Sequence, residues 1–455
     1  MDRSPQSPGM LTDRYELTML DSWVRDGHVH HRATFEAFAR RLPQGRRYGM
    51  LGGLGRLLPM IADFGFDDVE VSWLREQGVI GEQTAAYLRD LRFTGDVDAY
   101  REGDLYFPGS PVLTVSGTLG ECVLLETLVL SVLNHDSAIA SAAARMTTAA
   151  GDRPLVEMGS RRTHEQAAVA VARAAYVAGF ASTSNLAAGH LHGVPTVGTA
   201  AHAFTLAHAT EEAAFVSQVA AQGTGTTLLV DTYDIEEGIR TAVRVAGPEL
   251  GAIRIDSGDL AEESARARAL LDSLGNTRTR IIVTSDLDEF VISALADAPI
   301  DGYGVGTRVA TGSGHPTASM VYKLVAVADR PGADAPLRPV AKKSAAKASV
   351  GGRKLARRRH EDGVLVGEHY DVLDHDAAVE LAPDDVQVAV VRGGRVLHDP
   401  SLDEARATAR RALASLPPAA RSVAAGEAHL EVGATARDLP DPSSTPVPAS
   451  EGAPA

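Results

Sequence analysis

The stretch Leu228-Leu-Val-Asp231-Thr-Tyr-Asp234 is an apolar run that ends in polar residues, and the same pattern returns three times downstream. The later copies are Arg254-Ile-Asp256-Ser-Gly-Asp259, Val283-Thr-Ser-Asp286 and Gly302-Tyr-Gly304-Val-Gly306-Thr307. The apolar runs end roughly 20–30 residues apart, the length of one strand–helix unit, and a helical pattern follows most of them. Parallel strands in such units bring their carboxyl ends to one face, so we expect these polar residues to share a site.

The same transition from strand to loop is predicted three times upstream, after Glu157, near Asn185 and near Thr199. Together with the four downstream transitions this gives about seven strand ends. The economical prediction is an α/β fold with an irregular, incomplete βα barrel of parallel strands. An open, doubly wound sheet is the alternative that the spacing leaves open.

The chain, at 455 residues, is too long for one ordinary small domain. Residues 1–135 mix helical and strand patterns and are predicted to form an N-terminal α+β domain. Residues 136–335 are assigned to the α/β-barrel catalytic domain, and residues 336–437 to a C-terminal segment. Residues 438–455 are rich in Pro, Ser, Ala and Glu without an apolar pattern, so we expect a disordered tail.

The net charge of −15 and the single cysteine, Cys122, exclude several classes of protein. An acidic chain is poorly suited to nucleic acid, although a local basic patch stays open. One cysteine forms neither a disulfide framework nor a cysteine-rich zinc site, which favours the cytoplasm. The first eight residues lack the apolar core of a signal peptide, and no run approaches the ~20 apolar residues of a membrane span. We therefore expect a cytoplasmic protein that binds neither nucleic acid nor membrane.

A histidine follows one of the predicted strand ends, in Gly198-Thr-Ala-Ala-His202. At such a position His202 could act as a general base, a nucleophile toward phosphorus or a metal ligand. It could equally do no more than hydrogen-bond its own loop. His208 is six residues away and not at the i+4 spacing of a paired metal site, so a zinc site is disfavoured.

Arg254 and Asp256 flank Ile255, so they project from the same side of a strand toward the barrel interior. One interpretation is a structural ion pair. In the functional interpretation, Asp256 holds ribose hydroxyls or a metal, and the planar guanidinium of Arg254 faces an anionic ring substituent. Ser257 and Asp259 could instead cap the following helix.

Several segments could bind phosphate. The Gly304–Thr307 loop allows backbone N–H groups close approach, and late loops of parallel barrels often hold phosphates. Arg161 and its neighbour Arg162 could clamp a phosphate or begin a solvated helix. Asp231 and Asp234 could hold magnesium through water or cap helices, and the basic stretch 342–359 could be a lid or a solvated loop.

The order and spacing of these features together resemble the nicotinate phosphoribosyltransferase family, from Thr12 to about Lys354. The motifs that carry the resemblance are Thr12-Asp-Arg-Tyr15-Glu-Leu-Thr-Met, Ser110-Pro-Val-Leu, Leu124-Leu-Glu126-Thr, Gly159-Ser-Arg161-Arg162, Thr183-Ser-Asn185, Gly198-Thr-x-x-His202, Leu229-Val-Asp231-Thr-Tyr-Asp234, Arg254-x-Asp256-Ser-Gly-Asp259, Ser285-Asp-Leu-Asp288-Glu289, Gly304-Val-Gly306-Thr307 and Val321-Tyr-Lys323-Leu.

The resemblance implies an irregular α/β barrel packed on an α+β domain to which residues 336–437 return. It implies that nicotinate and phosphoribosyl pyrophosphate form nicotinate mononucleotide and pyrophosphate, an entry step to NAD. ATP hydrolysis would be coupled through a phosphohistidine, as in an ATP-dependent ligase, and Mg²⁺ would be required. A homodimer is implied, with Tyr15 reaching the ring from the neighbouring subunit.

The catalytic residues implied by the resemblance are His202, Asp256 and Arg254. The residues that it places at the substrates are Tyr15, Arg161, Thr183, Arg254, Ser257, Gly258, Ser285, Asp286, Gly304, Gly306 and Thr307. The metal ligands stay unassigned.

Two departures and three rivals accompany the resemblance. Met158 stands where relatives often place an aromatic ring, and Thr284-Ser285 replaces a common Ser-Asn pair. A nicotinamide phosphoribosyltransferase would use an aspartate near Ser182–Ser184, where no residue is acidic. A quinolinate phosphoribosyltransferase would need no ATP, and a catalytically silent paralogue would bind ligand without turnover.

Overall fold

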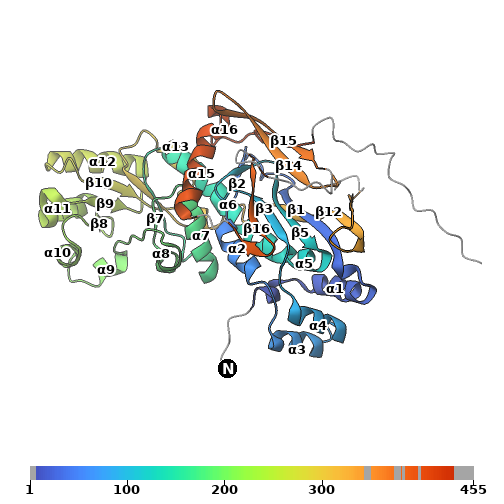
Figure 1. Cartoon of the computed structure of the whole chain (residues 1–455). Helices are drawn as coiled ribbons and strands as arrows, with labels where there is room; N and C mark the ends of the chain where they lie inside the picture. Colours follow the sequence, from blue (N-terminus) through green and yellow to red (C-terminus); the bar gives the residue numbers. More distant parts are fainter. Residues whose placement is uncertain (1–6, 343–349, 374–380, 382–384, 398–400, 435–455) are drawn as a thin grey trace, which may run out of the picture.

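The computed structural model of the chain describes residues 7–342, 350–373, 381, 385–397 and 401–434. The tail predicted to be disordered, residues 438–455, lies outside these ranges, as do Lys343 and Lys347 of the basic stretch. Two sheets organise the described chain, one parallel and one antiparallel, and Figure 1 shows them side by side with α7 and α15 between them.

The parallel sheet has six strands in the order β7-β6-β11-β10-β9-β8. Their bounds are β6 Leu155–Glu157, β7 Ser182–Thr183, β8 Thr227–Leu229, β9 Ala252–Ile255, β10 Arg280–Val283 and β11 Gly302–Val305. A parallel bridge between Thr183 and Thr196 extends the sheet beyond β7. Among the described strands β8 and β7 do not pair with each other, so the barrel stays open. This curled half-barrel confirms the predicted α/β class with an incomplete parallel barrel.

Helices connect and flank the parallel strands, and Figure 1 shows α10, α11 and α12 beside β8, β9 and β10. Their bounds are α7 Glu165–Val177, α8 Leu186–His192, α9 His202–Leu206, α10 Glu211–Gln222, α11 Ile235–Ala246, α12 Leu260–Ser273, α13 Glu289–Ala294 and α14 Thr307–Ala310, with a 3-10 turn at Gly247–Glu249. Several begin at the polar residues that end a strand. Asp234 accepts a hydrogen bond from the Glu237 N–H, and Asp259 accepts from Ala261 and Glu262. For these two aspartates the capping interpretation is confirmed.

The antiparallel sheet has seven strands in the order β13-β12-β1-β5-β3-β16-β17. Their bounds are β1 His31–Ala39, β3 Asp96–Tyr100, β5 Pro111–Thr118, β12 Met320–Pro331, β13 Leu337–Pro339, β16 Gln387–Arg392 and β17 Arg395–Val396. Strands from the N-terminal third therefore form the centre of this sheet, and later strands lie on both sides of them. Two smaller antiparallel pairs accompany it, β2 Gly49–Met50 with β4 Leu105–Tyr106, and β14 Lys354–Glu361 with β15 Val364–Val372.

Strand β12 differs from its prediction. The apolar run that begins at Tyr322 predicts a strand that closes the barrel block, residues 136–335, but β12 pairs antiparallel with β1 instead of joining the parallel sheet. Packing explains the choice, because the Tyr322 ring stacks on Phe35 with the centroids 4.9 Å apart, and both side chains are buried. The last strand of the predicted barrel block thus lies in the antiparallel sheet.

The apolar pattern of Gly120–Met146 predicts one long helix with a break near Asn134. The structure has two helices there, α5 Leu119–Leu124 and α6 Glu126–Ala150, and the interruption falls at Leu125. By length and composition alone Leu119–Ala150 could span a membrane, contrary to our sequence estimate, but 67% of its most apolar window is buried within the protein. Helix α6 contacts β12 and β2 on one side and α7 and α13 on the other, as expected of a core helix.

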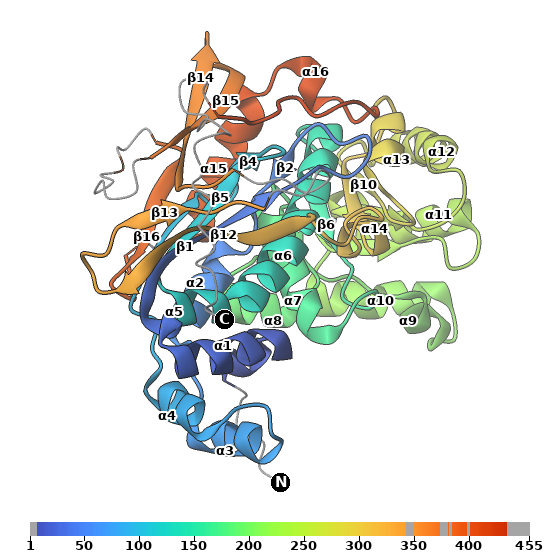
Figure 2. The ribbon, with the colours of Figure 1, turned by 90° about the vertical axis from the view of Figure 1, so that its right-hand side faces the viewer.

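The segment predicted as one helix, Trp73–Leu91, is also two, α3 Asp68–Glu76 and α4 Glu82–Asp90, separated at Gly78 with its φ of +63°. The remaining helices cover the antiparallel sheet or follow it in the chain. They are α1 Arg14–Asp26, α2 Leu54–Ala62, α15 Leu402–Ser415 and α16 Pro418–Arg421, with 3-10 turns at Pro8–Leu11 and His28–His30. Figure 2 shows α1, α3 and α4 together at one end of this half.

Candidate active site

His202 lies at the carboxyl edge of the parallel sheet, as the first residue of α9. Its Nδ1 is 3.1 Å from the hydroxyl of Thr232, in the loop after β8. Its Nε2 is 3.9 Å from a carboxylate oxygen of Asp231 and 3.9 Å from one of Asp256. The imidazole is 41% exposed, so the ring is oriented by its neighbours while one nitrogen stays open to a ligand.

Asp231 and Asp256 follow adjacent strands and are joined by hydrogen bonds. One oxygen of Asp231 accepts from the Asp256 N–H and from the Ser257 hydroxyl, both at 2.8 Å. Its other oxygen, Oδ1, is buried and has no hydrogen-bond partner in the described chain, and it is the atom nearest His202. Asp256 accepts a hydrogen bond from Thr284 after β10 and keeps 37% of its side chain exposed. A half-exposed carboxylate beside an unpartnered carboxylate oxygen is suited to bind hydroxyls or a cation.

Arg254 projects from β9 toward the same edge. Its guanidinium donates a hydrogen bond to the Thr199 hydroxyl in the loop that leads to His202, and its buried Nε has no partner among the described residues. Burial lowers the pKa of Arg254, and the nearby charge of Arg161 lowers it further, while Asp256 and Asp231 act in the opposite sense. A buried guanidinium that lies near a second positive charge favours binding of an anion. The interpretation of Arg254 as only an ion-pair partner of Asp256 does not account for this arrangement.

Glu157, at the end of β6, is a buried carboxylate that positions two loops. It accepts hydrogen bonds from the Gly159 N–H and from the Thr183 hydroxyl, the latter at 2.5 Å. Burial raises the pKa of Glu157, and these two hydrogen bonds offset part of the rise. Thr183 is itself fully buried, and its hydroxyl donates to Glu157.

The predicted phosphate-binding loops follow β10 and β11, the strands next to β9. Ser285 and Asp286 are exposed, and Ser285 has a φ of +139°, which is unusual for a residue with a side chain. Gly304 ends its strand against Met158, so closely that an added Cβ would lie 2.8 Å from the Met158 sulfur. Gly306 and Thr307 begin the short helix α14. Ser257 and Gly258, in the loop after β9, are exposed, and Gly258 has a φ of +84°.

The structure therefore brings all but one of the predicted site residues to one edge of a single sheet. The residues at or directly after strands of this edge are His202, Asp256, Arg254, Arg161, Thr183, Ser257, Gly258, Ser285, Asp286, Gly304, Gly306 and Thr307. Tyr15 is the exception. It lies on α1, beside the antiparallel sheet, and Figures 1 and 2 both show α1 apart from α9.

Tyr15 nevertheless has a defined environment. Its ring is 46% exposed, and burial of its hydroxyl beside the carboxylate of Glu126 raises its pKa. Glu126 lies 3.7 Å from the ammonium group of Lys323 on β12. The motifs that contain Tyr15, Glu126 and Lys323 thus meet in space, away from His202.

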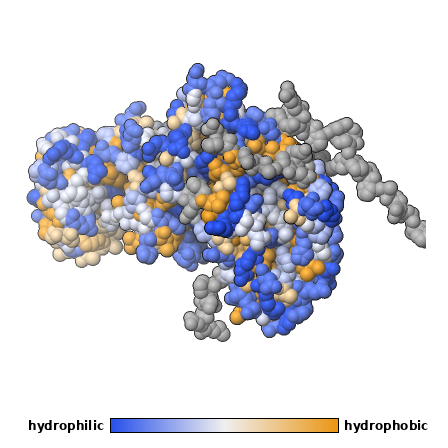
Figure 3. Space-filling view, in the orientation of Figure 1, coloured by the Kyte–Doolittle hydropathy of each residue, from blue (hydrophilic) through white to orange (hydrophobic). Residues whose placement is uncertain are grey.

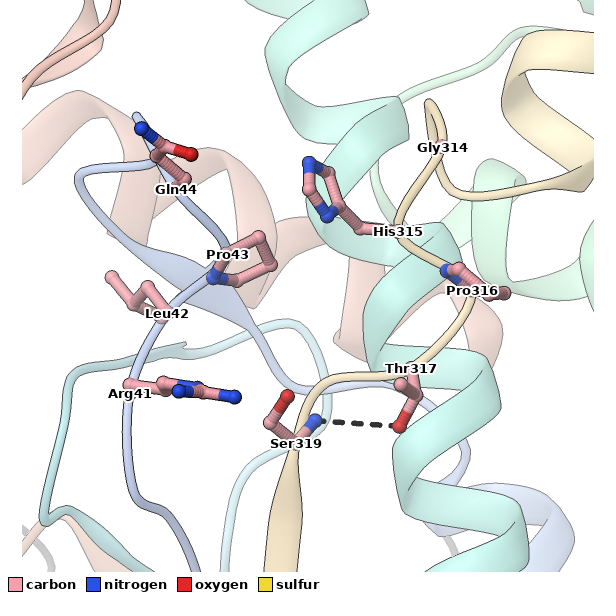
Figure 4. A pocket seen from close by; sticks show the side chains of 9 residues that line it. All are labelled: Arg41, Leu42, Pro43, Gln44, Gly314, His315, Pro316, Thr317 and Ser319. Atoms are coloured by element: carbon pink, nitrogen blue, oxygen red, sulfur yellow. Dashed lines mark hydrogen bonds between the residues drawn. The ribbon is translucent and has the colours of Figure 1, made fainter.

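A second recess, with a volume of about 400 Å³, lies where the loop after β1 faces the loop before β12 (Figure 4). Its lining residues, none of them predicted as functional, are Arg41, Leu42, Pro43, Gln44, Gly314, His315, Pro316, Thr317 and Ser319. Burial and the nearby charge of Arg46 lower the pKa of His315. No sequence motif marks this recess, because its two loops are more than 250 residues apart in the chain.

Exposed apolar side chains surround the parallel half near His202. Figure 3 shows apolar surface over α9 and α10, and the exposed side chains there include Leu206 at 61% and Val216 at 52%. Leu186 and Leu191 on α8 are exposed as well. Such a group of exposed apolar residues is typical of an interaction surface.

Comparison with known proteins agrees with the geometry. Residues 10–134 match the nicotinate phosphoribosyltransferase (NAPRTase) N-terminal domain. The nicotinate phosphoribosyltransferase pncB1 of Mycobacterium tuberculosis is 55% identical over 431 residues, which cover 92% of this chain and 93% of that protein. The chain belongs to the nicotinate phosphoribosyltransferase family. The human nicotinate phosphoribosyltransferase is 31% identical over 71% of this chain and 72% of its own length.

Solved structures agree with this membership. The crystal structure of human nicotinic acid phosphoribosyltransferase has a TM-score of 0.75 and 25% identity, over 93% of this chain and 97% of that one. Nicotinate-nucleotide pyrophosphorylase from Pyrococcus furiosus has a TM-score of 0.71 at 22% identity, over 90% and 95% of the two chains. The second similarity shows a shared fold only. Among nicotinate phosphoribosyltransferases and their structural neighbours, the substrate must therefore be inferred from the residues of the site.

Sequence reasoning missed three residues that this nicotinate phosphoribosyltransferase family member uses to build the site. Thr232 orients His202, Thr284 binds Asp256, and Glu157 joins two loops. Each follows or ends an apolar run, and that position was the available signal. Hydroxyls and carboxylates at strand ends also serve as helix caps, so the pattern alone did not distinguish residues of the site from capping residues.

Proposed function

We propose that this chain is an ATP-coupled nicotinate phosphoribosyltransferase, in which nicotinate and phosphoribosyl pyrophosphate give nicotinate mononucleotide and pyrophosphate. The observation that carries the proposal is Arg254, with its unpartnered buried Nε, at the same sheet edge as His202 and Asp256. An unpartnered guanidinium nitrogen on Arg254 suits the carboxylate of nicotinate. The amide of nicotinamide carries no charge to pair with it, and Ser182–Ser184 supply no acid for that amide.

His202 is the proposed site of phosphorylation. Thr232 engages Nδ1, which leaves Nε2 as the nucleophile. Nε2 would attack the γ-phosphorus of ATP, so that an N–P bond forms, the bond to the bridging oxygen breaks and ADP leaves. Asp231 and Asp256, each 3.9 Å from Nε2, would stabilise positive charge on the ring.

Asp256 and Asp231 also fit a magnesium requirement. The described residues contain no group of three or more His, Cys, Asp or Glu side chains that could hold a metal. Two carboxylates with an unpartnered oxygen are nonetheless what Mg²⁺ uses when substrate phosphates complete its shell. When bound, Mg²⁺ would neutralise charge on the leaving pyrophosphate. The loops at Ser285–Asp286 and Gly304–Thr307, with Ser257 and Gly258, would hold the ribose phosphate.

The proposed active unit is a cytoplasmic homodimer in which Tyr15 reaches the ring bound by the partner copy. The position of Tyr15, far from His202 in its own chain but exposed, supports this arrangement. The apolar side chains on α8, α9 and α10 supply a surface for the second copy. Sedimentation of the active enzyme as a monomer would overturn the dimer.

The test is a product assay with nicotinate and phosphoribosyl pyrophosphate, with and without ATP, and with nicotinamide or quinolinate in place of nicotinate. We expect nicotinate mononucleotide, stimulated by ATP. His202→Ala should abolish ATP hydrolysis and its stimulation. His208→Ala is the matched control, because the His208 ring, two residues after α9, has the Phe204 backbone carbonyl as its one hydrogen-bond partner among the described residues. Preference for nicotinamide or quinolinate, or ATP stimulation that survives His202→Ala, would defeat the proposal.

A further inference from the structure

A second buried carboxylate, outside the site described so far, is central to the region between the two sheets. Glu289 is the first residue of α13 and follows the Ser285–Asp286 turn by three residues. Its side chain is 2% exposed. A carboxylate this deeply buried needs partners that compensate its lost hydration.

Its partners come from two different elements. One oxygen of Glu289 accepts from Nε of Arg145, on the core helix α6, at 3.0 Å. The other accepts from the hydroxyl of Ser313 at 2.6 Å, in the loop that enters the recess of Figure 4. Burial raises the pKa of Glu289, but these hydrogen bonds outweigh it and hold the pKa below its usual value. The carboxylate is therefore ionised and connects three segments.

A second arginine completes the cluster. Arg46 is 4% exposed, donates to the Gly312 carbonyl at 2.6 Å and is attracted by Glu289 and repelled by Arg145. Arg46 and Arg145 each keep one buried nitrogen, Nη1, without a partner among the described residues. Loss of the Glu289 charge would thus leave two buried cations facing one another.

The backbone on both sides of the carboxylate is in a conformation that side chains rarely adopt. Ser285 has a φ of +139° on one side, and Ser313 a φ of +52° on the other, between Gly312 at +62° and Gly314 at +84°. Such conformations persist where the surroundings hold them in place, and they cluster at functional sites. Glu289 is hydrogen-bonded to Ser313 in one of these segments and follows Ser285 of the other by four residues in the chain.

We propose that Glu289 is a positioning residue that fixes the Ser285–Asp286 turn relative to the Gly312–Ser319 loop, so that the sugar-phosphate loop and the recess are presented together. This rests on the proposed function, because that function assigns the Ser285–Asp286 turn to the phosphoribosyl substrate. On the nicotinate side of the site, Arg254 lies on β9 and Thr199 in the loop before α9, and in the described part of the chain neither is hydrogen-bonded to this cluster. Disturbing Glu289 should therefore affect one substrate selectively.

The experiment compares Glu289→Gln with wild type in steady-state kinetics for each substrate and in thermal unfolding. We expect the KM for phosphoribosyl pyrophosphate to rise about tenfold or more, as for loss of a charged hydrogen bond, with the KM for nicotinate within about twofold. Ser313→Ala, which removes one hydrogen bond and keeps every charge, should show a smaller selective rise. If Glu289→Gln does not fold, the same two KM values are measured for Ser313→Ala and Glu289→Asp, and these variants test the positioning role.

Glu102→Gln is the matched control. Glu102 is also buried and is paired with buried Arg173, but it bonds the backbone of Gly53 and Gly55, far along the chain from the sheet edge. The Glu102→Gln substitution should lower the unfolding temperature and leave the ratio of the two KM values unchanged. Equal changes of both KM values in the Glu289 and Ser313 variants, or no change, would overturn the positioning role. An inactive wild type would instead refute the proposed function, so the two failures are distinct.

Discussion

Arg254 shows how burial gives one side chain its chemistry. The guanidinium donates a hydrogen bond to Thr199, while its buried Nε has no partner in the described chain. The nearby positive charge of Arg161 destabilises the positive charge of Arg254. Such a group has more to gain from a bound carboxylate than an arginine in solvent. Its role is therefore testable by comparison of the two substrates.

We expect Arg254→Ala to raise the KM for nicotinate by one to two orders of magnitude, as for loss of a charged hydrogen-bonded pair, with much less change for phosphoribosyl pyrophosphate. Arg254→Lys should recover little, because an ammonium group lacks the planar fork. Steady-state kinetics with each substrate varied in turn gives the answer. Thr199→Val is the control that keeps the charge and removes the hydrogen bond. Similar increases for both substrates would show that Arg254 is structural.

Glu16 gives a prediction for stability against pH. It is fully buried beside Thr127, whose N–H and hydroxyl lie 3.2 and 2.5 Å from it, and burial raises its pKa from 4.5 to about 7. The folded protein then binds more protons at this site than the unfolded chain between these two values, so stability falls as pH rises from about 4.5 to about 7. Glu16→Gln mimics the protonated form and should lose this part of the slope.

Urea unfolding at pH 5 and pH 7.5 measures that slope for both proteins. The variant should gain stability relative to wild type at the higher pH and match it at the lower. Parallel curves across the whole range would mean that Glu16 titrates normally in the folded protein.

At the scale of elements, strand ends were predictable and strand partners were not. The apolar runs before Asp231, Asp256 and Thr284 each became a short parallel strand, because period and turn chemistry are local properties. The strand at Tyr322 has the same apolar character, but it pairs with β1, nearly 300 residues earlier in the chain. Which surface covers an apolar strand depends on packing between distant segments, which no local pattern contains. The links through Thr232, Thr284 and Glu157 were hidden for the same reason.

Gly304 tests the packing of two such strand ends. A Cβ there would lie 2.5 Å from a methyl carbon of Thr284 and 2.8 Å from the Met158 sulfur, inside contact distance. Gly304→Ala should therefore push β11 away from β6 and β10, with a loss of about 1–3 kcal/mol in unfolding free energy and reduced turnover. Denaturant unfolding and the product assay check both effects.

Gly225→Ala is the control, since nothing lies within 4 Å of a Cβ at that position. It should behave like wild type. A Gly304→Ala enzyme with wild-type stability would show that Met158 moves aside without cost, and the close approach would then have no role in the site.

At the scale of the whole molecule, the C-terminal segment crosses between the two halves. Arg145 donates to the Val423 carbonyl, and the N–H groups of Gly426 and His429 donate to the carbonyls of Gly45 and Arg47. Farther on, Val432 donates to the Pro108 carbonyl, and Gly433 accepts from the Tyr370 N–H. The segment thus holds the chain around Arg46, which also faces Glu289. Composition gave no sign of this, because the stretch is neither strongly apolar nor periodic.

Two truncations separate this crossing segment from the tail that follows it. A chain that ends at residue 434 keeps every contact just named, and we expect its unfolding temperature and turnover to match the full-length protein. A chain that ends at residue 421 loses these five hydrogen bonds and two more, which join Arg47 to the Ala425 carbonyl and the His429 ring to the Leu365 carbonyl. Each is worth about 1 kcal/mol, so this chain should unfold several degrees lower. The Gly45–Arg47 loop would lose these hydrogen bonds, so the KM of this shorter enzyme for phosphoribosyl pyrophosphate should rise as well. Equal unfolding temperatures for the two truncated chains would mean that the segment rests on the surface without supporting the loop beneath it.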